Sequence, residues 1–399
     1  MFKQVRRIIE RVRQQGDVAL RYFSEKYDSV RLDNLKVPAA AIEMARTSLS
    51  EETKEILLEA IANVRDFHEK QLPKSWTKEG EDGSILGMRF TPIKNVGCYI
   101  PGGSAGYPST AIMTVVPAQI AGVKRIVLVS RPINEGLANL LVMAVAGLLG
   151  IHEIYTLGGA QAIAALAFGT ESIPKVDKIV GPGNAFVNEA KRQVFGTVGI
   201  DTLAGPTELV ILADEFARVE YVVRDLFAQA EHDSEARVIL VTTSKELADA
   251  VRMKANELLA KTQRRDILEQ SLRKHGAVVI VADLREGAQL VNQIAPEHVQ
   301  IITQSPEAIL SQIENAGAIC LGDLTPVVVG DYFAGPNHVL PTGRSATFAS
   351  PLSVSDFLKF SSIIHYSRAR FEQDAPKIAQ FAELEGLDNH KNAITCRYE

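Results

Sequence analysis

The stretch VGCYIPGG, residues 96–103, marks the start of a regular pattern in the chain. Its β-prone run, Val96–Ile100, stops at a proline and two glycines, and an apolar helix candidate, Ala111–Ala121, follows. The alternation continues, with strands predicted at residues 125–130, 153–157 and 178–180 and helices at residues 135–149 and after Gly158. Alternating strands and helices indicate a parallel sheet with helices on both faces. These strands are continuous apolar runs, as strands buried on both faces usually are.

A second series of the same kind begins after Asp201. Its predicted strands are residues 208–213, 237–242, 277–281, 299–303 and 318–321, with helices at residues 219–230 and 245–261. The sequence therefore predicts an α/β fold with two parallel-sheet lobes, joined near residues 203–206. A chain of 399 residues suits two lobes, because a single core stops growing at about 250–300 residues.

Helical segments flank the two lobes. Residues 1–70 are expected to be helical, since apolar residues recur there at helical spacing, and residues 71–95 to form a hairpin or loop. We expect residues 1–98 and 207–352 to form one lobe, and residues 99–206, which hold several Gly-rich turns, to form the other. The tail, residues 353–399, is predicted to be helical and too short to fold alone. It is therefore expected to dock on another surface, with a second subunit as the candidate.

Composition and charge exclude several classes of protein. Apolar residues make up 46% and charged residues 23%, which is typical of a globular fold and excludes a disordered chain. A net charge of −5 without a basic run argues against nucleic acid as a partner. Three cysteines without CxxC spacing exclude a disulfide framework and a cysteine-rich zinc site. The longest apolar run, residues 137–151, is too short to span a membrane, so we expect a soluble, cytoplasmic protein with no membrane partner.

Three Gly-rich turns follow predicted strands of one lobe, at residues 102–106, 158–161 and 181–184. Backbone N–H groups at such turns can bind phosphate, and ligands of open α/β sheets lie beyond the carboxyl ends of the strands. Each turn also has a polar side chain beside it, namely Tyr99, Gln161 and Asn184. No GxGxxG fingerprint is present, and tight packing alone also uses glycine. The turns favour a nucleotide site in this lobe.

Histidines and carboxylates form a second set of candidates. Gln229 and His232 lie one turn apart at the end of a predicted helix, Glu297 and His298 are adjacent before a predicted strand, and a polar segment carries Asp331 and His338. Glu385 and His390 lie close together near the C-terminus. Neutral imidazole and carboxylate suit Zn²⁺, and an adjacent Glu and His suit two proton transfers. Plain alternatives stay open, with His232 as a helix cap and the Glu297–His298 pair as a surface loop.

The chain is similar to the histidinol dehydrogenases. The resemblance rests on stretches that occur in the order found in that family and extend over nearly the whole chain. They are YIPGGSAGYPST (99–110), GGAQAIAALAFGTESIPKVDKIVGPGN (158–184), DTLAGPTE (201–208), QAEHD (229–233), APEHV (295–299), GDYFAGPNHVLPTG (330–343), SPLSVSDFLK (350–359) and EGLDNH (385–390).

The resemblance implies a fold, an assembly and a set of ligands. The fold would be two Rossmann-like lobes that lack the GxGxxG fingerprint, in a homodimer whose C-terminal tail reaches the partner and whose active sites are shared. One Zn²⁺ per subunit would be bound by Gln229, His232, Asp331 and His390 of the partner subunit. Eight residues would contact the substrate, L-histidinol: Thr207, Gln229, His232, His298, Asp331, His338, Glu385 and His390. The cofactor NAD⁺ would be contacted by Tyr99, Gln161 and Asn184.

The implied activity is the four-electron oxidation of L-histidinol to L-histidine through the aldehyde, which forms the last steps of histidine biosynthesis. In this chemistry His298 takes the hydroxyl proton, and Glu297 then activates the water that attacks the aldehyde. Zinc would mainly orient the substrate.

Two positions depart from the family pattern and keep an alternative open. Thr207 stands where serine is usual, and Thr347 stands where arginine is expected. A related zinc- and NAD-dependent dehydrogenase of another amino alcohol or hydroxy compound is therefore the second interpretation. A zinc hydrolase is a third, because a Glu-activated water beside zinc also performs hydrolysis. A non-catalytic binding protein is a fourth, and the intact Glu297–His298 pair argues against it.

Overall fold

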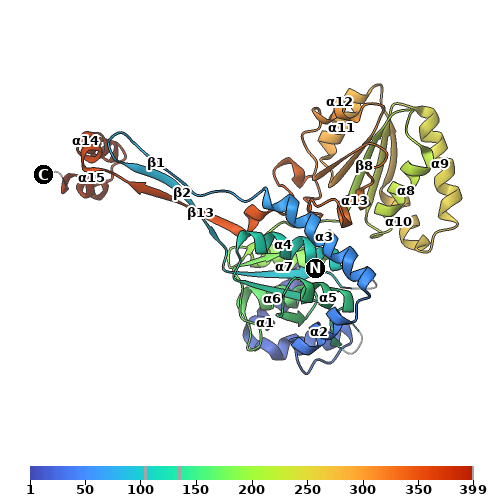
Figure 1. The fold of residues 1–399 in the computed structure, drawn as a ribbon, viewed down its shortest axis with the longest axis horizontal. Helices are drawn as coiled ribbons and strands as arrows, with labels where there is room; N and C mark the ends of the chain where they lie inside the picture. Colours follow the sequence, from blue (N-terminus) through green and yellow to red (C-terminus); the bar gives the residue numbers. More distant parts are fainter. Residues whose placement is uncertain (103–105, 134–135, 398–399) are drawn as a thin grey trace. The chain divides into compact units, whose positions relative to one another are not determined.

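The computed structural model of the protein describes residues 1–102, 106–133 and 136–397, and its chain divides into two compact units. The first unit comprises Met1–Gln71 and Ile93–Phe357, and the second comprises Leu72–Pro92 and Leu358–Glu399 (Figure 1).

The helices and strands alternate through most of the first unit. Its helices are α1 (Phe2–Phe23), α2 (Ala39–Thr47), α3 (Glu51–Glu69), α4 (Pro108–Ala121), α5 (Leu140–Leu148), α6 (Gly159–Phe168), α7 (Ala185–Val194), α8 (Val219–Ala230), α9 (Lys245–Leu259), α10 (Arg265–His275), α11 (Leu284–Ile294), α12 (Pro306–Leu310) and α13 (Val327–Tyr332). Its strands are β3 (Asn95–Ile100), β4 (Arg125–Ser130), β5 (Ile154–Thr156), β6 (Lys178–Val180), β7 (Gly199–Ile200), β8 (Glu208–Ala213), β9 (Arg237–Thr242), β10 (Gly276–Ile280), β11 (His298–Ile302) and β12 (Ala318–Leu321).

Two five-stranded sheets organise this unit. The strand orders are β5-β4-β3-β6-β7 and β10-β9-β8-β11-β12, and every pair of neighbours is parallel. In both sheets the first strand in sequence is central and the chain turns back across it, which is the doubly wound arrangement. The predicted α/β class with two parallel-sheet lobes is confirmed, and the predicted strands 125–130, 178–180, 208–213, 237–242 and 318–321 match in their bounds.

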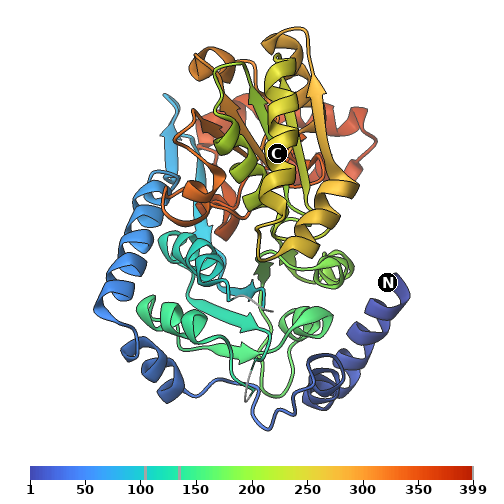
Figure 2. The same cartoon turned by 90° about the vertical axis from the view of Figure 1, so that its right-hand side faces the viewer.

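The N-terminal helices pack against the first sheet's helices. Helix α1 contacts α6 and α7, α2 contacts α5, and α3 contacts α4 (Figure 2, blue beside green). Val5, Ile8 and Leu20 of α1 share one core with Val127 of β4 and Ile163 of α6. The sequence-based grouping of residues 1–98 with residues 207–352 differs from these contacts. The reason is that an amphipathic helix shows from its pattern which face it buries, but not against which sheet.

The second unit is an antiparallel sheet followed by helices. Strands β1 (Trp76–Glu79) and β2 (Ile85–Pro92) form the hairpin predicted for residues 71–95, and β13 (Leu358–His365) pairs with β2 along its whole length. Helices α14 (Arg368–Leu384) and α15 (Asp388–Thr395) then end the chain as predicted. The expectation that helix starts at residue 353 was wrong, since β13 intervenes. Most side chains of β13 are exposed, so no apolar alternation marked it as a strand.

Parts of two predictions fall outside the described residues. They are the Gly-rich turn at residues 102–106, of which residues 103–105 are not described, and the start of the helix predicted at residues 135–149. Within the described ranges, none of the helices has the length and apolar character needed to cross a membrane.

Candidate active site

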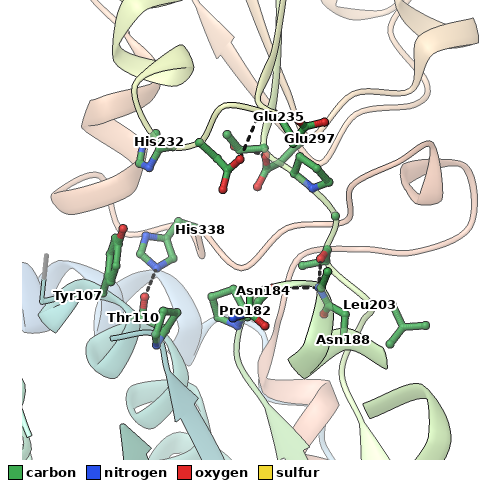
Figure 3. A pocket seen from close by; sticks show the side chains of 18 of the residues that line it. Tyr107, Thr110, Pro182, Asn184, Asn188, Leu203, His232, Glu235, Glu297 and His338 are labelled. Carbon is green, nitrogen blue, oxygen red and sulfur yellow. Dashed lines mark hydrogen bonds between the residues drawn. The ribbon is translucent and has the colours of Figure 1, made fainter. Parts of the chain in front are cut away.

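A pocket of about 730 Å³ opens in the first unit between opposite edges of its two sheets. The carboxyl edge of the first sheet contributes Pro101, Pro182 and Asn184, which follow β3 and β6. The amino edge of the second sheet contributes Thr207 and Glu297, which precede β8 and β11. Figure 3 shows His232 and Glu297 on one side and Tyr107, Thr110, Pro182 and Asn184 on the other.

The order of the strands and the path of the chain between them explain why the candidate residues of the second sheet lie at one edge. Strands β8 and β11 are parallel neighbours, so Thr207 and Glu297, one position before each strand, lie side by side. Helix α8 starts at the carboxyl edge after β8 and must return to the amino edge before β9 begins. Its last turn and the following residues therefore bring Gln229 and His232 to the same edge.

Glu297 is buried, with 8% of its surface exposed. Its Oε2 accepts a hydrogen bond from the backbone N–H of Glu208 at 2.9 Å and another from the Thr207 hydroxyl. Burial raises the pKa of Glu297 to about 7, and these two hydrogen bonds oppose the rise. A carboxyl group with such a pKa can both accept and donate a proton near neutral pH.

His298 is buried beside Glu297, with its Nδ1 at 3.2 Å from the carbonyl oxygen of Glu208. That contact favours the tautomer in which Nδ1–H donates and Nε2 keeps its lone pair. Burial lowers the pKa of His298, which keeps the ring neutral. The side chain therefore offers a neutral base at Nε2.

A chain of hydrogen bonds joins Gln229 to Glu297. The Nε2 of Gln229 donates to the Thr207 hydroxyl, and that hydroxyl donates to Glu297. The chain fixes the amide of Gln229 through its nitrogen, which leaves its carbonyl oxygen for another partner. Thr207 thus orients two predicted site residues at once.

Asp331 and His338 complete the pocket wall. Asp331 lies near the end of α13, and burial raises its pKa to about 6. His338 places Nδ1 at 3.1 Å from the carbonyl oxygen of Asp331 and Nε2 at 3.5 Å from the Thr110 hydroxyl (Figure 3). Burial lowers the pKa of His338 to about 4, so its ring is neutral. His232 lies at the solvent-exposed rim.

The pocket contains only part of the zinc-ligand set that the resemblance implies. Within residues 1–102, 106–133 and 136–397, no three His, Cys, Asp or Glu side chains are grouped to hold a metal ion. The pocket provides His232, Asp331 and the amide of Gln229, whose nitrogen and oxygen donors suit zinc chemically. A cation would also compensate the half-buried carboxylate of Asp331. Three such donors fit a zinc ion whose remaining position is filled by substrate, water or a further side chain.

Glu385 and His390 belong to the second unit. Glu385 follows α14, His390 lies on α15, and both side chains are exposed there. The other predicted substrate and metal residues line the pocket of the first unit, whereas these two residues are part of the second unit. Their assignment to the site remains a prediction.

The three predicted cofactor residues lie at the carboxyl edge of the first sheet. Tyr99 is the last but one residue of β3 and is buried, and its hydroxyl accepts a hydrogen bond from the N–H of Gly159 at 3.1 Å. Gln161 is buried in the first turn of α6, and Asn184 caps α7 by accepting from the N–H groups of two following residues. The amino ends of two ten-residue helices therefore meet there, which suits a pyrophosphate chemically.

Gly181 shows why these turns contain glycine. Its φ is +111°, and a Cβ there would lie 2.2 Å from the carbonyl oxygen of Tyr99. The close approach of β3 and the GPGN turn therefore excludes any side chain, which is a packing reason independent of a ligand.

Sequence reasoning missed a buried histidine that supports the pocket. His68 has charged neighbours in sequence, which favour an exposed position, but it is fully buried. Its Nδ1 contacts the carbonyl oxygen of Val64 at 2.7 Å, and its Nε2 faces the amide nitrogen of Asn337, next to His338, at 3.4 Å. The sequence pattern that indicates its burial is helical spacing: His68 lies four residues after Val64 and eight after Ala60, and both of these are buried on α3.

Comparison with known proteins gives consistent matches over the whole chain. A family model for histidinol dehydrogenase matches residues 1–398. Histidinol dehydrogenase from Bacillus subtilis (strain 168) is 50% identical over 395 residues, covering 99% of this chain and 92% of that protein. The one from Geobacillus kaustophilus (strain HTA426) is 50% identical over 392 residues, covering 98% and 92%. A crystal structure of histidinol dehydrogenase from Elizabethkingia anophelis superposes with a TM-score of 0.94 at 35% identity, covering 99% and 91%.

Proposed function

The chain belongs to the histidinol dehydrogenase family, and from that premise we propose how its own residues carry out the reaction. It is an oxidoreductase of histidine biosynthesis, a histidinol dehydrogenase, that oxidises L-histidinol to L-histidine through the aldehyde. The observation that carries the mechanism is the buried Glu297–His298 pair at the wall of the pocket, with a neutral histidine beside a carboxyl group of pKa about 7.

His298 is the base of the first oxidation. Its Nδ1–H is held by the carbonyl oxygen of Glu208, so Nε2 accepts the hydroxyl proton of the alcohol as the carbon is oxidised. The imidazolium that forms lies near Glu297, whose Oε2 is 3.7 Å from Nδ1. The second oxidation needs the same base again, when the hydrated aldehyde loses its hydroxyl proton.

Glu297 serves the step between the two oxidations. In its carboxylate form it removes a proton from the water that attacks the aldehyde carbon, which gives the hydrated aldehyde. Thr207 and the N–H of Glu208 hold one oxygen of Glu297, so the other oxygen is left to face the water. Because the aldehyde is reactive, the pocket must retain it through both oxidations.

The ligands follow from the same arrangement. Gln229, His232 and Asp331, together with His390 of the partner subunit, would hold one zinc ion, which would supply Lewis acidity and help to orient the substrate. NAD⁺, bound beside Tyr99, Gln161 and Asn184, would accept the hydride in each oxidation. Thr207, His338 and Glu385 would contact the substrate. We further propose a homodimer with shared sites, working in the cytoplasm.

Two substitutions test the division of roles. His298→Gln should lower turnover by about 10²–10⁴-fold, while the affinity for L-histidinol, measured by calorimetry, stays within a few-fold. Glu297→Gln should slow oxidation of the aldehyde more than oxidation of the alcohol.

His152→Gln, at an exposed histidine, is the matched control for both variants and should keep full activity. Near-normal turnover of His298→Gln, or equal losses in both steps for Glu297→Gln, would remove the residue from its assigned role.

A further inference from the structure

Arg131 lies at a position where doubly wound folds commonly bind the adenosine ribose of a dinucleotide. It directly follows β4, the strand beside β3, at the carboxyl edge of the first sheet. A Cβ on Gly102 or Gly158 would lie 2.7 or 3.1 Å from the Cβ of Arg131, so Arg131 adjoins two of the Gly-rich turns. In doubly wound nucleotide-binding folds, an acidic residue at this strand end binds the 2′-hydroxyl of NAD, and an arginine nearby accommodates the 2′-phosphate of NADP.

This chain has both groups, and they are paired. Asp28, which ends the turn after α1, accepts a hydrogen bond from the Nε of Arg131 through Oδ1 at 2.6 Å. The carbonyl oxygen of Tyr27 accepts a second one from Nη2 at 3.3 Å. The guanidinium is thus held by the N-terminal segment, although 42% of the Arg131 side chain stays exposed.

One carboxylate oxygen of Asp28 accepts no hydrogen bond from the described residues. Its side chain is only 6% exposed, and Oδ2 is buried without a hydrogen-bond partner among them. A buried carboxylate oxygen without a donor is costly, and buried polar atoms normally have partners. The missing donor and the adjoining turns together point to a ligand hydroxyl.

We propose that Asp28 and Arg131 select between nucleotides at the 2′ position of the adenosine ribose, so that the enzyme accepts NAD⁺ and rejects NADP⁺. The inference rests on the proposed binding of the dinucleotide at the carboxyl edge of the first sheet. The ribose 2′-hydroxyl donates to Oδ2 of Asp28. A 2′-phosphate meets the carboxylate instead, and Arg131 cannot compensate for that repulsion because Asp28 already holds it.

Removing the charge of Asp28 should convert Arg131 into a phosphate ligand. In Asp28→Asn, affinity for NADP⁺ should rise by about tenfold or more, the change expected for one new charge-assisted hydrogen bond. Affinity for NAD⁺ should fall by a few-fold, since an amide replaces the carboxylate acceptor. Asp28→Asn/Arg131→Met should lose the gain for NADP⁺, which shows that Arg131 provides it.

The readout is equilibrium binding without substrate, by calorimetry with NAD⁺, NADP⁺, AMP and adenosine 2′,5′-bisphosphate, with turnover as a second measure. Glu153→Gln is the matched control, because Glu153 pairs with Arg125 at 2.6 Å at the opposite end of β4. It should leave the ratio of the NADP⁺ and NAD⁺ affinities unchanged, and thermal unfolding checks that each variant folds. If Asp28→Asn is unstable, Arg131→Met alone should lower the affinity for NAD⁺ only slightly, since it leaves the carboxylate in place.

The outcomes separate the two proposals. Wild-type protein that binds neither nucleotide overturns the proposed cofactor site. Wild-type protein that binds NAD⁺ and NADP⁺ equally, or a folded Asp28→Asn with an unchanged affinity ratio, overturns the role of the Asp28–Arg131 pair and leaves the cofactor site standing. A large loss of NAD⁺ binding in Arg131→Met would assign direct recognition to Arg131 and would also overturn the inference.

Discussion

Thr207 connects Gln229 to Glu297, so a single hydroxyl orients two side chains of the pocket. Thr207→Val keeps the volume and removes the hydroxyl, and it should lower turnover by about 10–100-fold, as losses of such supporting hydrogen bonds usually do. Thr207→Ser restores the hydroxyl without the methyl group and should keep turnover near that of the wild type. Steady-state kinetics with L-histidinol measures both. Near-normal turnover of Thr207→Val together with a loss in Thr207→Ser would show that the methyl group, rather than the hydrogen bonds, matters.

Residues of one site are recognisable from the sequence mainly where they lie close together along the chain. Glu297 and His298 were recognisable because they are adjacent in sequence, and Gln229 and His232 because a helical turn separates them. Asp28 and Arg131 were not singled out, because 103 positions separate them along the chain. The charged neighbours of His68 in sequence favour the surface, although its own helix face is buried.

At the scale of elements, a buried ion pair fixes the turn between β6 and α7. The Nζ of Lys191 on α7 donates to the carbonyl oxygen of Gly181 at 3.0 Å and pairs with Asp201, whose other oxygen accepts from the N–H of Gly181 at 2.7 Å. Both side chains are almost fully buried. The pair therefore clamps both polar backbone groups of Gly181, which begins the GPGN turn that carries Asn184.

Breaking that pair should destabilise the protein strongly. Lys191→Met leaves the carboxylate of Asp201 buried without its cation, and the free energy of unfolding should fall by about 3–5 kcal/mol. Lys245→Met is the control, because Lys245 pairs with Asp249 on the exposed surface, where such pairs contribute about 0–1 kcal/mol. Chemical denaturation of both variants provides the comparison. A loss below 1 kcal/mol in Lys191→Met would contradict the assigned role.

Most strands of the two parallel sheets were predictable because they are largely apolar runs between turn residues. β7 was missed because it has only two residues, and β13 because its side chains are mostly exposed and follow no alternation. The order of the strands, and the sheet on which α1–α3 pack, depend on contacts between distant segments. Periodicity within one segment carries no information about such contacts.

At the scale of the whole molecule, the proposed site needs two chains. The pocket of the first unit holds three of the proposed zinc donors, and the proposed fourth, His390, lies on α15 of the second unit. A mixture of His298→Gln and His390→Ala subunits should therefore regain about a quarter of wild-type turnover, because half of the dimers are mixed and each of these has one intact site. The measurement is turnover after verified subunit exchange. No recovery would show that each chain builds its own site.

The central claim, a zinc-requiring oxidation of L-histidinol in two NAD⁺-linked steps, is tested most directly by the stoichiometry of NADH. Purified protein is supplied with NAD⁺ and a limiting amount of L-histidinol, before and after chelation and after zinc is restored. The account predicts two NADH for each L-histidinol, loss of activity on chelation and recovery with zinc. One NADH for each L-histidinol, with the aldehyde accumulating, or full activity in the chelated protein, would contradict it.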